Sequence, residues 1–498
     1  MNVNPITRLD YPDPDVIRVE DTYYMVSTTM HFMPGCEILQ SFDLVHWEHV
    51  TYVYETLDHT DAQQLKSGQN IYGQGMWAAS LRYHEGRFCI CFVANDTRKT
   101  YLYTSEKIDG PWKKQLIEGF YHDGSLLFDE DGRNYIVYGN DEIWITELNE
   151  DLTAPKKDGL HRLLVSDHKN PELGYEGSHI QKINGYYYIF LIHSLRDRWM
   201  RTEACFYSDS LEGEFTGGDV LCDDRGYCGQ GVAQGGIVDT PDGKWYAMLF
   251  QDYGAVGRIP ILLPVTWKDH FPFFGQNGHV PEEIEVHSTR PGYIYQPLVG
   301  SDDFCNGLLP HWQFNHDPDP RYYHLDALQG TYTITTREVC TELTQAVNTL
   351  TQRMSYPSCA AEVTVDASAL KEGDVAGLCA LQSCYAAVGI TKHHGKYEVL
   401  MLDKKEDGIL DMTEGTVVES HQMDFRLEAD FCNMKDEARC YYRVNKGDWL
   451  PIGTVHKLYF KLDHFTGCRF GLFCYAAEET GGSACFRDFK YYDVDEIS

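Results

Sequence analysis

One short pattern recurs five times in the first half of the chain, and it limits the fold more than any other feature. Each copy places one or two turn residues before an aromatic-rich strand, and four of the five turns contain glycine. Helical periodicity is nearly missing from this half. The copies read EDTYYMVST, EGRFCICFVAN, DGRNYIVYGN, NGYYYIFLIHS and DGKWYAMLFQD.

The spacing of these copies is typical of a β-propeller. Short strands that repeat with one turn-plus-aromatic signature per unit indicate this fold, and five signatures predict five blades. The alternative is one or two β-sandwiches whose hairpins are similar by chance. The recurring aromatic positions, roughly 50 to 65 residues apart, are Tyr24, Phe88, Tyr135, Tyr187 and Tyr246.

The rest of the sequence predicts a second all-β domain. A chain of 498 residues is too long for one ordinary core, so two domains are expected. The segment EVHSTRPGYIYQPLVGSDDF carries polar, proline and glycine positions without a strand signal, which puts the boundary near residues 285–300. We therefore expect a propeller over residues 1–290 and a β-sandwich over residues 291–498.

Composition narrows the range of partners. The formal net charge of −33 repels nucleic acid and anionic membrane surfaces, and no run approaches the ~20 apolar residues of a membrane span. The first residues lack the apolar stretch of a signal peptide, and sixteen scattered cysteines without a CxxC pair suggest reduced thiols. We expect a cytoplasmic protein with a neutral partner. Its 34 Tyr, 23 Phe and 9 Trp suit sugars, whose C–H faces stack on aromatic rings.

Three acidic residues occupy corresponding places in three of the five units. Asp13 precedes the first unit, Asp123 the third and Glu176 the fourth, each about 9 to 12 residues ahead of its aromatic position. The innermost strands of a propeller converge on a central channel, so side chains near their ends face one another across a small pocket. The shared phase favours a common site, although each acid alone is more typical of a solvated turn.

Three carboxylates in one pocket suit the cleavage of a glycosidic bond. One carboxylic acid protonates the leaving oxygen, and one carboxylate activates water or attacks the anomeric carbon. A third carboxylate beside the acid keeps it protonated near neutral pH by like-charge repulsion. Pro14 restricts Asp13 to extended backbone conformations, and Pro12 limits Tyr11 in the same way. We therefore expect Asp13 to be held nearly rigid, as suits a base aimed at a water.

The motifs around these acids resemble family 43 of the glycoside hydrolases, and the resemblance runs through essentially the whole chain. NPITRLDYPDPDVIRV is similar to the opening motif whose Asp-Pro aspartate is the general base, here Asp13. YHDGSLLFDEDG resembles the segment whose aspartate tunes and orients the acid, here Asp123, with Gly124 where many members have proline. GYEGSHIQKINGYYY resembles the segment that holds the general acid, here Glu176.

The resemblance implies an inverting enzyme. Members are five-bladed propellers with β-xylosidase or α-L-arabinofuranosidase activity, and those most similar to this chain carry a carboxy-terminal concanavalin-like β-sandwich. Inversion implies that base and acid stand roughly 6.5–9.5 Å apart. We expect exo action that releases terminal xylose or arabinose from xylo- or arabinoxylo-oligosaccharides, as in xylan degradation. The choice between xylose and arabinose and the oligomeric state stay open.

Three further residues fall on sugar-site motifs of the family. Trp77 in GQGMWAASLRYHEGRF matches a Trp-Ala-Pro motif, with Ala79 in place of proline, and would form a wall of the pocket. Phe32 in TTMHFMPGCEILQSFDLVHWE matches an aromatic that flanks the same sugar. Arg258 in YGAVGRIPILLPVTW matches an arginine that binds sugar hydroxyls. Core packing is the alternative for both aromatics, and a structural ion pair is the alternative for Arg258.

No cofactor is required for this chemistry, and the metal content stays unknown. Many members have a Gly-His pair in the fifth blade, whose histidine lies on the propeller axis near a calcium ion or a water. The corresponding region, GVAQGGIVDTPDGKWY, has no histidine, so a structural calcium is conceivable but unsupported. His193 in FLIHS could approach the axis, although a lone strand histidine is more often a core residue.

Two other functions remain as alternatives. A carbohydrate-binding protein without catalysis would not need three carboxylates in phase. A retaining five-bladed fructosidase would use a first-blade nucleophile in an Asn-Asp-Pro context, a Glu-Cys acid motif and carboxylates about 5–5.5 Å apart. This chain instead has Tyr-Glu-Gly at the acid.

Overall fold

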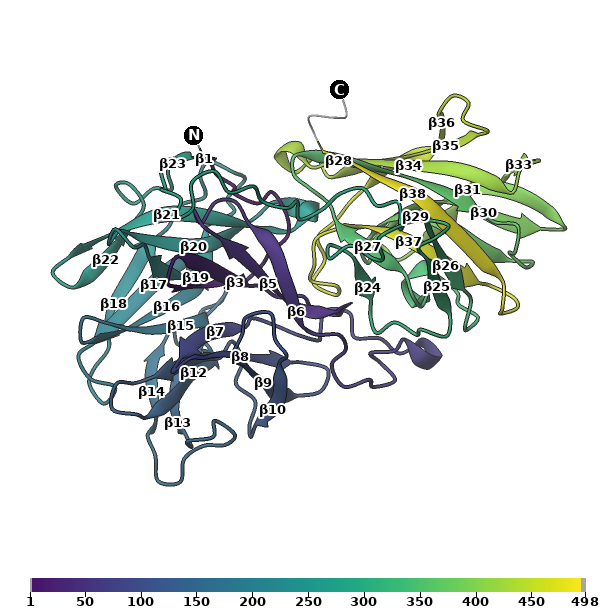
Figure 1. Cartoon of the computed structure of the whole chain (residues 1–498). Helices are drawn as coiled ribbons and strands as arrows, with labels where there is room; N and C mark the ends of the chain where they lie inside the picture. The colour runs from purple at the N-terminus through teal and green to yellow at the C-terminus, as the bar shows by residue number, and fades with distance from the viewer. Residues whose placement is uncertain (1, 494–498) are drawn as a thin grey trace.

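The computed structural model describes residues 2–493 and consists of two all-β domains side by side (Figure 1). The purple-to-teal half of the chain forms a ring of five four-stranded sheets, and the green-to-yellow half forms two larger sheets. None of the helices in the described range is long and apolar enough to cross a membrane. These helices are short 3-10 turns, at Lys66–Gly68, Gly254–Val256, Leu343–Gln345 and Cys432–Met434.

Each sheet of the ring is an antiparallel blade whose strands follow one another along the chain. Blade one contains β2 (Asp15–Val19), β3 (Thr22–Val26), β5 (Gly35–Ser41) and β6 (Glu48–Tyr54). Blade two contains β7 (Ser80–His84), β8 (Arg87–Ala94), β9 (Lys99–Ser105) and β10 (Lys113–Ile117). Blade three contains β11 (Ser125–Phe128), β12 (Asn134–Asn140), β13 (Glu142–Leu148) and β14 (His161–Ser166). Blade four contains β15 (Glu176–Ile183), β16 (Tyr186–Ser194), β17 (Arg201–Ser208) and β18 (Thr216–Leu221). Blade five contains β19 (Ala233–Asp239), β20 (Trp245–Asp252), β21 (Arg258–Lys268) and β22 (Phe271–Phe274).

The five repeated signatures form the hairpins between the first and second strands of the five blades, so the predicted five-bladed propeller is confirmed. In blade four the turn is Asn184-Gly185, and both residues have positive φ, 51° and 85°. A two-residue hairpin of this kind matches the twist of the strands, and Asn-Gly adopts it at little cost. The aromatic residues that follow the turns fill the space between blades: Tyr135 of blade three and Tyr187 of blade four belong to one buried cluster.

The start of the chain closes the ring against blade five. β1 (Asn2–Val3) pairs with β23 (Glu283–Ile284), which follows the last blade. The Asn4 side chain donates to the Leu262 carbonyl at 2.8 Å and accepts from the Leu262 N–H at 3.0 Å, which copies a strand pairing. The propeller is thus tied shut by segments that lie more than 250 residues apart.

The second domain is a sandwich of two antiparallel sheets, as expected for a concanavalin-like domain. The predicted boundary at residues 290–291 falls between β23 and β24. One sheet contains β24 (Gln313–Asn315), β27 (Leu350–Arg353), β29 (Asp374–Leu381), β30 (Ala386–His393), β31 (Lys396–Lys404), β32 (Leu410–Met412), β33 (Thr416–Val418) and β37 (Arg469–Ala476). The other contains β25 (Tyr323–Asp326), β26 (Thr331–Thr335), β28 (Ser358–Asp366), β34 (Gln422–Asp430), β35 (Glu437–Val444), β36 (Leu450–Lys457) and β38 (Ser483–Asp493).

The two domains share a sheet edge and a buried ion pair. β4 (Phe32–Met33), between the second and third strands of blade one, pairs with β24 and so extends the first sheet of the sandwich. Arg353 of the sandwich donates to the Glu37 carboxylate of blade one at 2.8 Å, and both side chains are almost fully buried. The sandwich is therefore packed on the propeller in one defined position, which matters for the site below.

Candidate active site

The three predicted carboxylates lie at the same end of three first strands. Asp13 and Asp123 each stand two residues before a first strand, β2 and β11, and Glu176 is the first residue of β15. These first strands contact one another around the ring, so they are the innermost strands of the propeller. The carboxylates therefore converge at one mouth of the central channel, as their shared phase in the sequence predicts.

Asp13 is rigidly held, but its backbone differs from the expectation. Its φ is +53°, in the left-handed region, so the prediction of an extended conformation imposed by Pro14 is wrong. A short polar side chain tolerates this conformation when its carboxylate is bound on both sides. Thr28 Oγ1 donates to Oδ2 at 2.6 Å, and Arg258 Nη1 donates to Oδ1 at 3.0 Å. The carboxylate is thereby fixed by side-chain contacts and is only 6 % exposed.

Asp123 and Glu176 are joined through the backbone of the acid's own strand. Asp123, which also has a positive φ of 48°, accepts the Gly177 N–H at 2.9 Å. The register of β15 against β16 shifts between Glu176 and His179, and such bulges often re-aim a side chain near a site. Asn140 Nδ2 donates to Oε2 of Glu176 at 2.6 Å and orients it.

His122 is a member of this group that the sequence reasoning missed. Its Nε2 lies 3.4 Å from Oε2 of Glu176 and 3.6 Å from Oδ2 of Asp123, so one ring nitrogen faces both carboxylates. The negative charge of Asp123 raises the pKa of His122 to about 9, because it outweighs the opposite effect of burial. Glu176 and Asp13 raise this pKa further. The sequence signal that could have identified His122 is its position next to Asp123 in YHDGSLL. At neutral pH an imidazolium therefore lies between the acid and its neighbour.

The electrostatics of Asp123 follow from its surroundings. Burial, followed by the like charges of Glu176 and Asp13, raises its pKa to about 6 in spite of the nearby imidazole. The ligand atoms of His122, Asp123 and Glu176 lie within 4.8 Å of one another, so these three side chains have the composition and spacing to bind a metal ion. Such an ion would compete with the proton of the acid.

An aromatic wall beside the carboxylates is built from both domains. The Trp77 ring lies 5.9 Å from the His122 ring and 5.4 Å from the ring of Phe465, between centroids. Phe465 belongs to the sandwich, in the loop between β36 and β37, and its ring covers the guanidinium of Arg258 at 4.4 Å. The sandwich therefore contributes a side chain to this mouth of the propeller.

Arg258 and Phe32 have contacts that were not expected from the family motifs. Arg258 is 2 % exposed, and its guanidinium donates to Asp13 and, at 3.4 Å, to the Phe465 carbonyl. Phe32 is 2 % exposed as well, and its ring is covered by the guanidinium of Arg469 at 3.5 Å. Arg258 thus joins the carboxylate group, whereas the contacts of Phe32 lie at the domain junction. Sugar binding by either residue stays a prediction.

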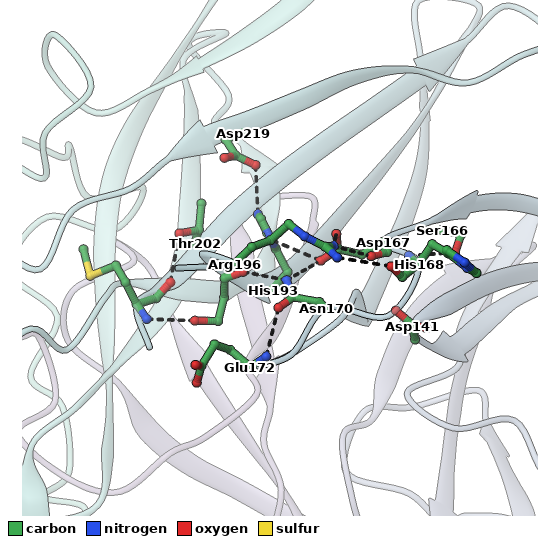
Figure 2. A network of polar contacts seen from close by, with 12 residues as sticks. Asp141, Ser166, Asp167, His168, Asn170, Glu172, His193, Arg196, Thr202 and Asp219 are labelled. Carbon is green, nitrogen blue, oxygen red and sulfur yellow. Dashed lines mark hydrogen bonds and ion pairs between the residues drawn. The ribbon is translucent and has the colours of Figure 1, made fainter. Parts of the chain in front are cut away.

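A polar network supports the loop that leads to Glu176 (Figure 2). His193 lies 2.8 Å from Asp219 and 3.4 Å from Asp167, and Arg196 pairs with Asp167 at 3.0 Å. Asn170, in the loop itself, donates to the Ser194 carbonyl at 2.8 Å. His193 is therefore a nearly buried residue of blade four whose ring nitrogens face Asp167 and Asp219.

Both domains match known families. The family model described as glycosyl hydrolases family 43 matches residues 3–272, and the beta xylosidase C-terminal concanavalin A-like domain matches residues 301–492. A beta-xylosidase of Formosa agariphila is 26 % identical over 99 % of this chain and 89 % of its own length.

Solved structures agree with these matches. A bifunctional GH43-CE protein of Bacteroides eggerthii superimposes with a TM-score of 0.92 and is 42 % identical over 99 % of this chain, which spans 64 % of its length. A GH43 glycoside hydrolase engineered to display both endo-xylanase and exo-arabinofuranosidase activity has a TM-score of 0.85 and 28 % identity over 99 % of both chains. The chain therefore belongs to family 43 of the glycosyl hydrolases.

Proposed function

We propose that this protein is an inverting, exo-acting glycoside hydrolase that releases terminal xylose, arabinose or both from short hemicellulose-derived oligosaccharides. The observation that carries the proposal is the convergence of three carboxylates from three innermost strands at one mouth of the channel. The names of the relatives, a beta-xylosidase and an enzyme with exo-arabinofuranosidase activity, support the choice of sugars.

The roles follow from the contacts of each carboxylate. Asp13, bound by Thr28 and Arg258, is the general base that activates a water. Glu176 is the general acid that protonates the leaving oxygen, and Asp123 orients the acid's strand through the Gly177 N–H. Trp77 and Phe465 offer flat faces beside the acid on which a sugar ring can stack. Carboxylates and water suffice for this scheme, so it needs no bound cofactor.

The test is sugar release, followed by the stereochemistry of the product. Activity on 4-nitrophenyl β-D-xyloside and α-L-arabinofuranoside, measured side by side, gives the preferred sugar. Proton NMR of the first product from an unactivated xylo-oligosaccharide should show the anomer opposite to that of the substrate. A product of retained configuration would favour the fructosidase-like alternative, and binding without release would favour a carbohydrate-binding protein.

A further inference from the structure

Arg82 reaches across the propeller axis from the first strand of blade two. Its guanidinium has five N–H groups, and each of them has an acceptor. Nη1 donates to Oδ2 of Asp15 in blade one at 2.8 Å. Nη2 donates to Ser125 Oγ in blade three at 2.7 Å and to the Ile180 carbonyl in blade four at 3.2 Å. The other two N–H groups, on Nε and Nη1, bind the carbonyls of Leu126 and Leu81 at 2.9 and 2.6 Å.

Asp15 is the anionic partner at the centre of this arrangement. It is fully buried, and burial alone would raise its pKa. The charges of Arg82 and His179, together with hydrogen bonds from His179 and the Leu81 N–H, outweigh burial, so the pKa is lowered. Its Oδ1 lies 3.1 Å from Nδ1 of His179 in blade four. Blade five completes the ring through Gly236, where a Cβ atom would stand 3.3 Å from His179 and 3.7 Å from Asp15. The first strands of all five blades therefore meet around this ion pair.

A calcium ion at the axis, which the sequence left unsupported, does not fit these residues. Ca²⁺ takes about six to eight oxygen ligands. Among the described hydrogen-bond partners of Arg82, only Asp15 has a carboxylate. Both oxygens of Asp15 already face donors or His179. A fixed guanidinium beside it would also repel a second cation. The positive charge at the axis is therefore part of the chain itself.

The strands that Arg82 joins to its own are those that carry the three proposed catalytic carboxylates, β2, β11 and β15. Each acceptor lies two to four residues along the chain from the carboxylate. The pairs of carboxylate and acceptor are Asp13 with Asp15, Asp123 with Ser125, and Glu176 with Ile180. A shift of the guanidinium would therefore change the distances between base, acid and orienting carboxylate.

We propose that Arg82 is a positioning residue, an internal axial cation that sets the spacing of the three carboxylates. The inference rests on the proposed function, because it assigns these carboxylates their roles. Arg82 acts through the strands it holds. A misplacement of a catalytic group by about 1 Å can cost on the order of 10²-fold in rate, so a residue that fixes the spacing of the carboxylates affects turnover strongly.

A cavity gives access to Arg82 from the far side. It has a volume of about 440 Å³, and it is lined by later parts of all five first strands, including Arg82 and Arg18, and by none of the three carboxylates. A small cation can therefore reach the place of a truncated Arg82 without entering the sugar pocket. This separation allows chemical rescue to be measured without competition against substrate.

The experiment compares Arg82→Ala with Arg18→Ala. Arg18 lines the same cavity but pairs with Asp239, 2.5 Å away. For Arg82→Ala we expect kcat to fall by on the order of 10²-fold with KM changed only a few-fold, and millimolar guanidinium to restore part of kcat. Arg18→Ala should keep wild-type kcat and show no rescue. In His122→Asn, which lacks one member of the possible metal-binding group at the mouth, the melting temperature should respond neither to calcium nor to a chelator.

Three results would overturn the proposal. They are undiminished kcat in Arg82→Ala, a loss of activity that only follows the unfolded fraction and is not rescued, and a melting temperature of His122→Asn that rises with calcium and falls with chelator. If Arg82→Ala does not fold, Ser125→Ala is the second variant, because it removes one acceptor of the Arg82 guanidinium. It should lower kcat and leave KM nearly unchanged. An unchanged kcat in Ser125→Ala would count against the proposal. An inactive wild-type protein would refute the proposed function instead, while the calcium and chelator response of His122→Asn still tests the axial cation.

Discussion

Arg258 Nη1 lies 3.0 Å from Oδ1 of Asp13, and this bond joins the predicted sugar-binding arginine to the predicted base. Both side chains are almost fully buried. Because Thr28 binds the other oxygen, the carboxylate cannot rotate without breaking one of the two bonds. The ring of Phe465 covers the guanidinium, so the sandwich domain also helps to hold the base. The geometry of the base thus depends on both domains.

Asp13→Asn should remove nearly all turnover and leave the fold intact, because the amide keeps the shape of the side chain and loses its basicity. We expect kcat on an unactivated xylo-oligosaccharide to fall by at least about 10²-fold. Asp151→Asn, a change at an exposed residue, is the matched control and should keep full activity. Near-normal kcat in a folded Asp13→Asn protein would refute its assignment as the base.

Glu176→Gln should affect substrates according to their leaving groups. An acidic phenol leaves without protonation, whereas a sugar alcohol needs the proton that Glu176 supplies. We therefore expect a far larger loss of kcat/KM on xylobiose than on 4-nitrophenyl β-D-xyloside. Equal losses on both substrates would count against Glu176 as the acid.

The features that sequence reasoning predicted are local or repeat along the chain. The turn-plus-aromatic signature marks each blade because every blade uses the same first hairpin, and the three carboxylates share a phase because each stands at the start of an innermost strand. Contacts between distant segments gave no such signal. Phe465 meets Trp77 across 388 residues, and the five acceptors of Arg82 come from four blades. Only the folded chain shows these contacts.

The backbone of Asp13 shows a second reason why a prediction from the sequence can fail. The Asp-Pro pair predicted an extended residue from a steric preference that usually holds. The guanidinium of Arg258 and the hydroxyl of Thr28 both bind the carboxylate of Asp13. These two bonds outweigh the steric preference and hold φ at +53°. Tertiary contacts at a site can therefore override a local rule, and such positions are where backbone expectations fail.

His122 should stabilise the fold in a pH-dependent way. Its pKa is about 9 in the folded protein and about 6.5 when unperturbed, so its contribution is complete below pH 6.5 and is lost as the pH rises through 9. We expect the wild-type protein to exceed His122→Asn in free energy of unfolding by on the order of 1–2 kcal/mol at pH 6. This advantage should vanish near pH 10. Urea unfolding at both pH values measures it, and a constant difference would contradict the charged state of His122.

The ion pair between Glu37 and Arg353 should limit stability in acid. Burial would raise the pKa of Glu37, but Arg353 and His49 lower it to about 2 from 4.5. The stabilisation is therefore present above pH 4.5 and is lost as the pH falls toward 2. At pH 7, Arg353→Met should cost about 3–5 kcal/mol, because it leaves a buried carboxylate unpaired.

The double variant Glu37→Gln/Arg353→Met is the control for this pair. It removes both charges, so it should be clearly more stable than Arg353→Met alone. Denaturant unfolding of the two single variants, the double variant and the wild-type protein gives the coupling free energy. Additive losses would mean that the two side chains do not depend on each other across the domain junction.

Asp123→Asn tests whether the three carboxylates act as one group. Burial and the charges of Glu176 and Asp13 raise the pKa of Asp123 to about 6, because these negative charges repel one another in the site. The variant removes this repulsion, and the alkaline limb of the kcat/KM profile should move to lower pH. The maximum should also fall by about 10²-fold, because the bond to the Gly177 N–H is weakened. If Asp123 were only a turn residue, the variant would lose some stability and keep its profile. A full pH–rate curve on an unactivated disaccharide with an unmoved limb and an undiminished maximum would leave Asp13 and Glu176 as a pair.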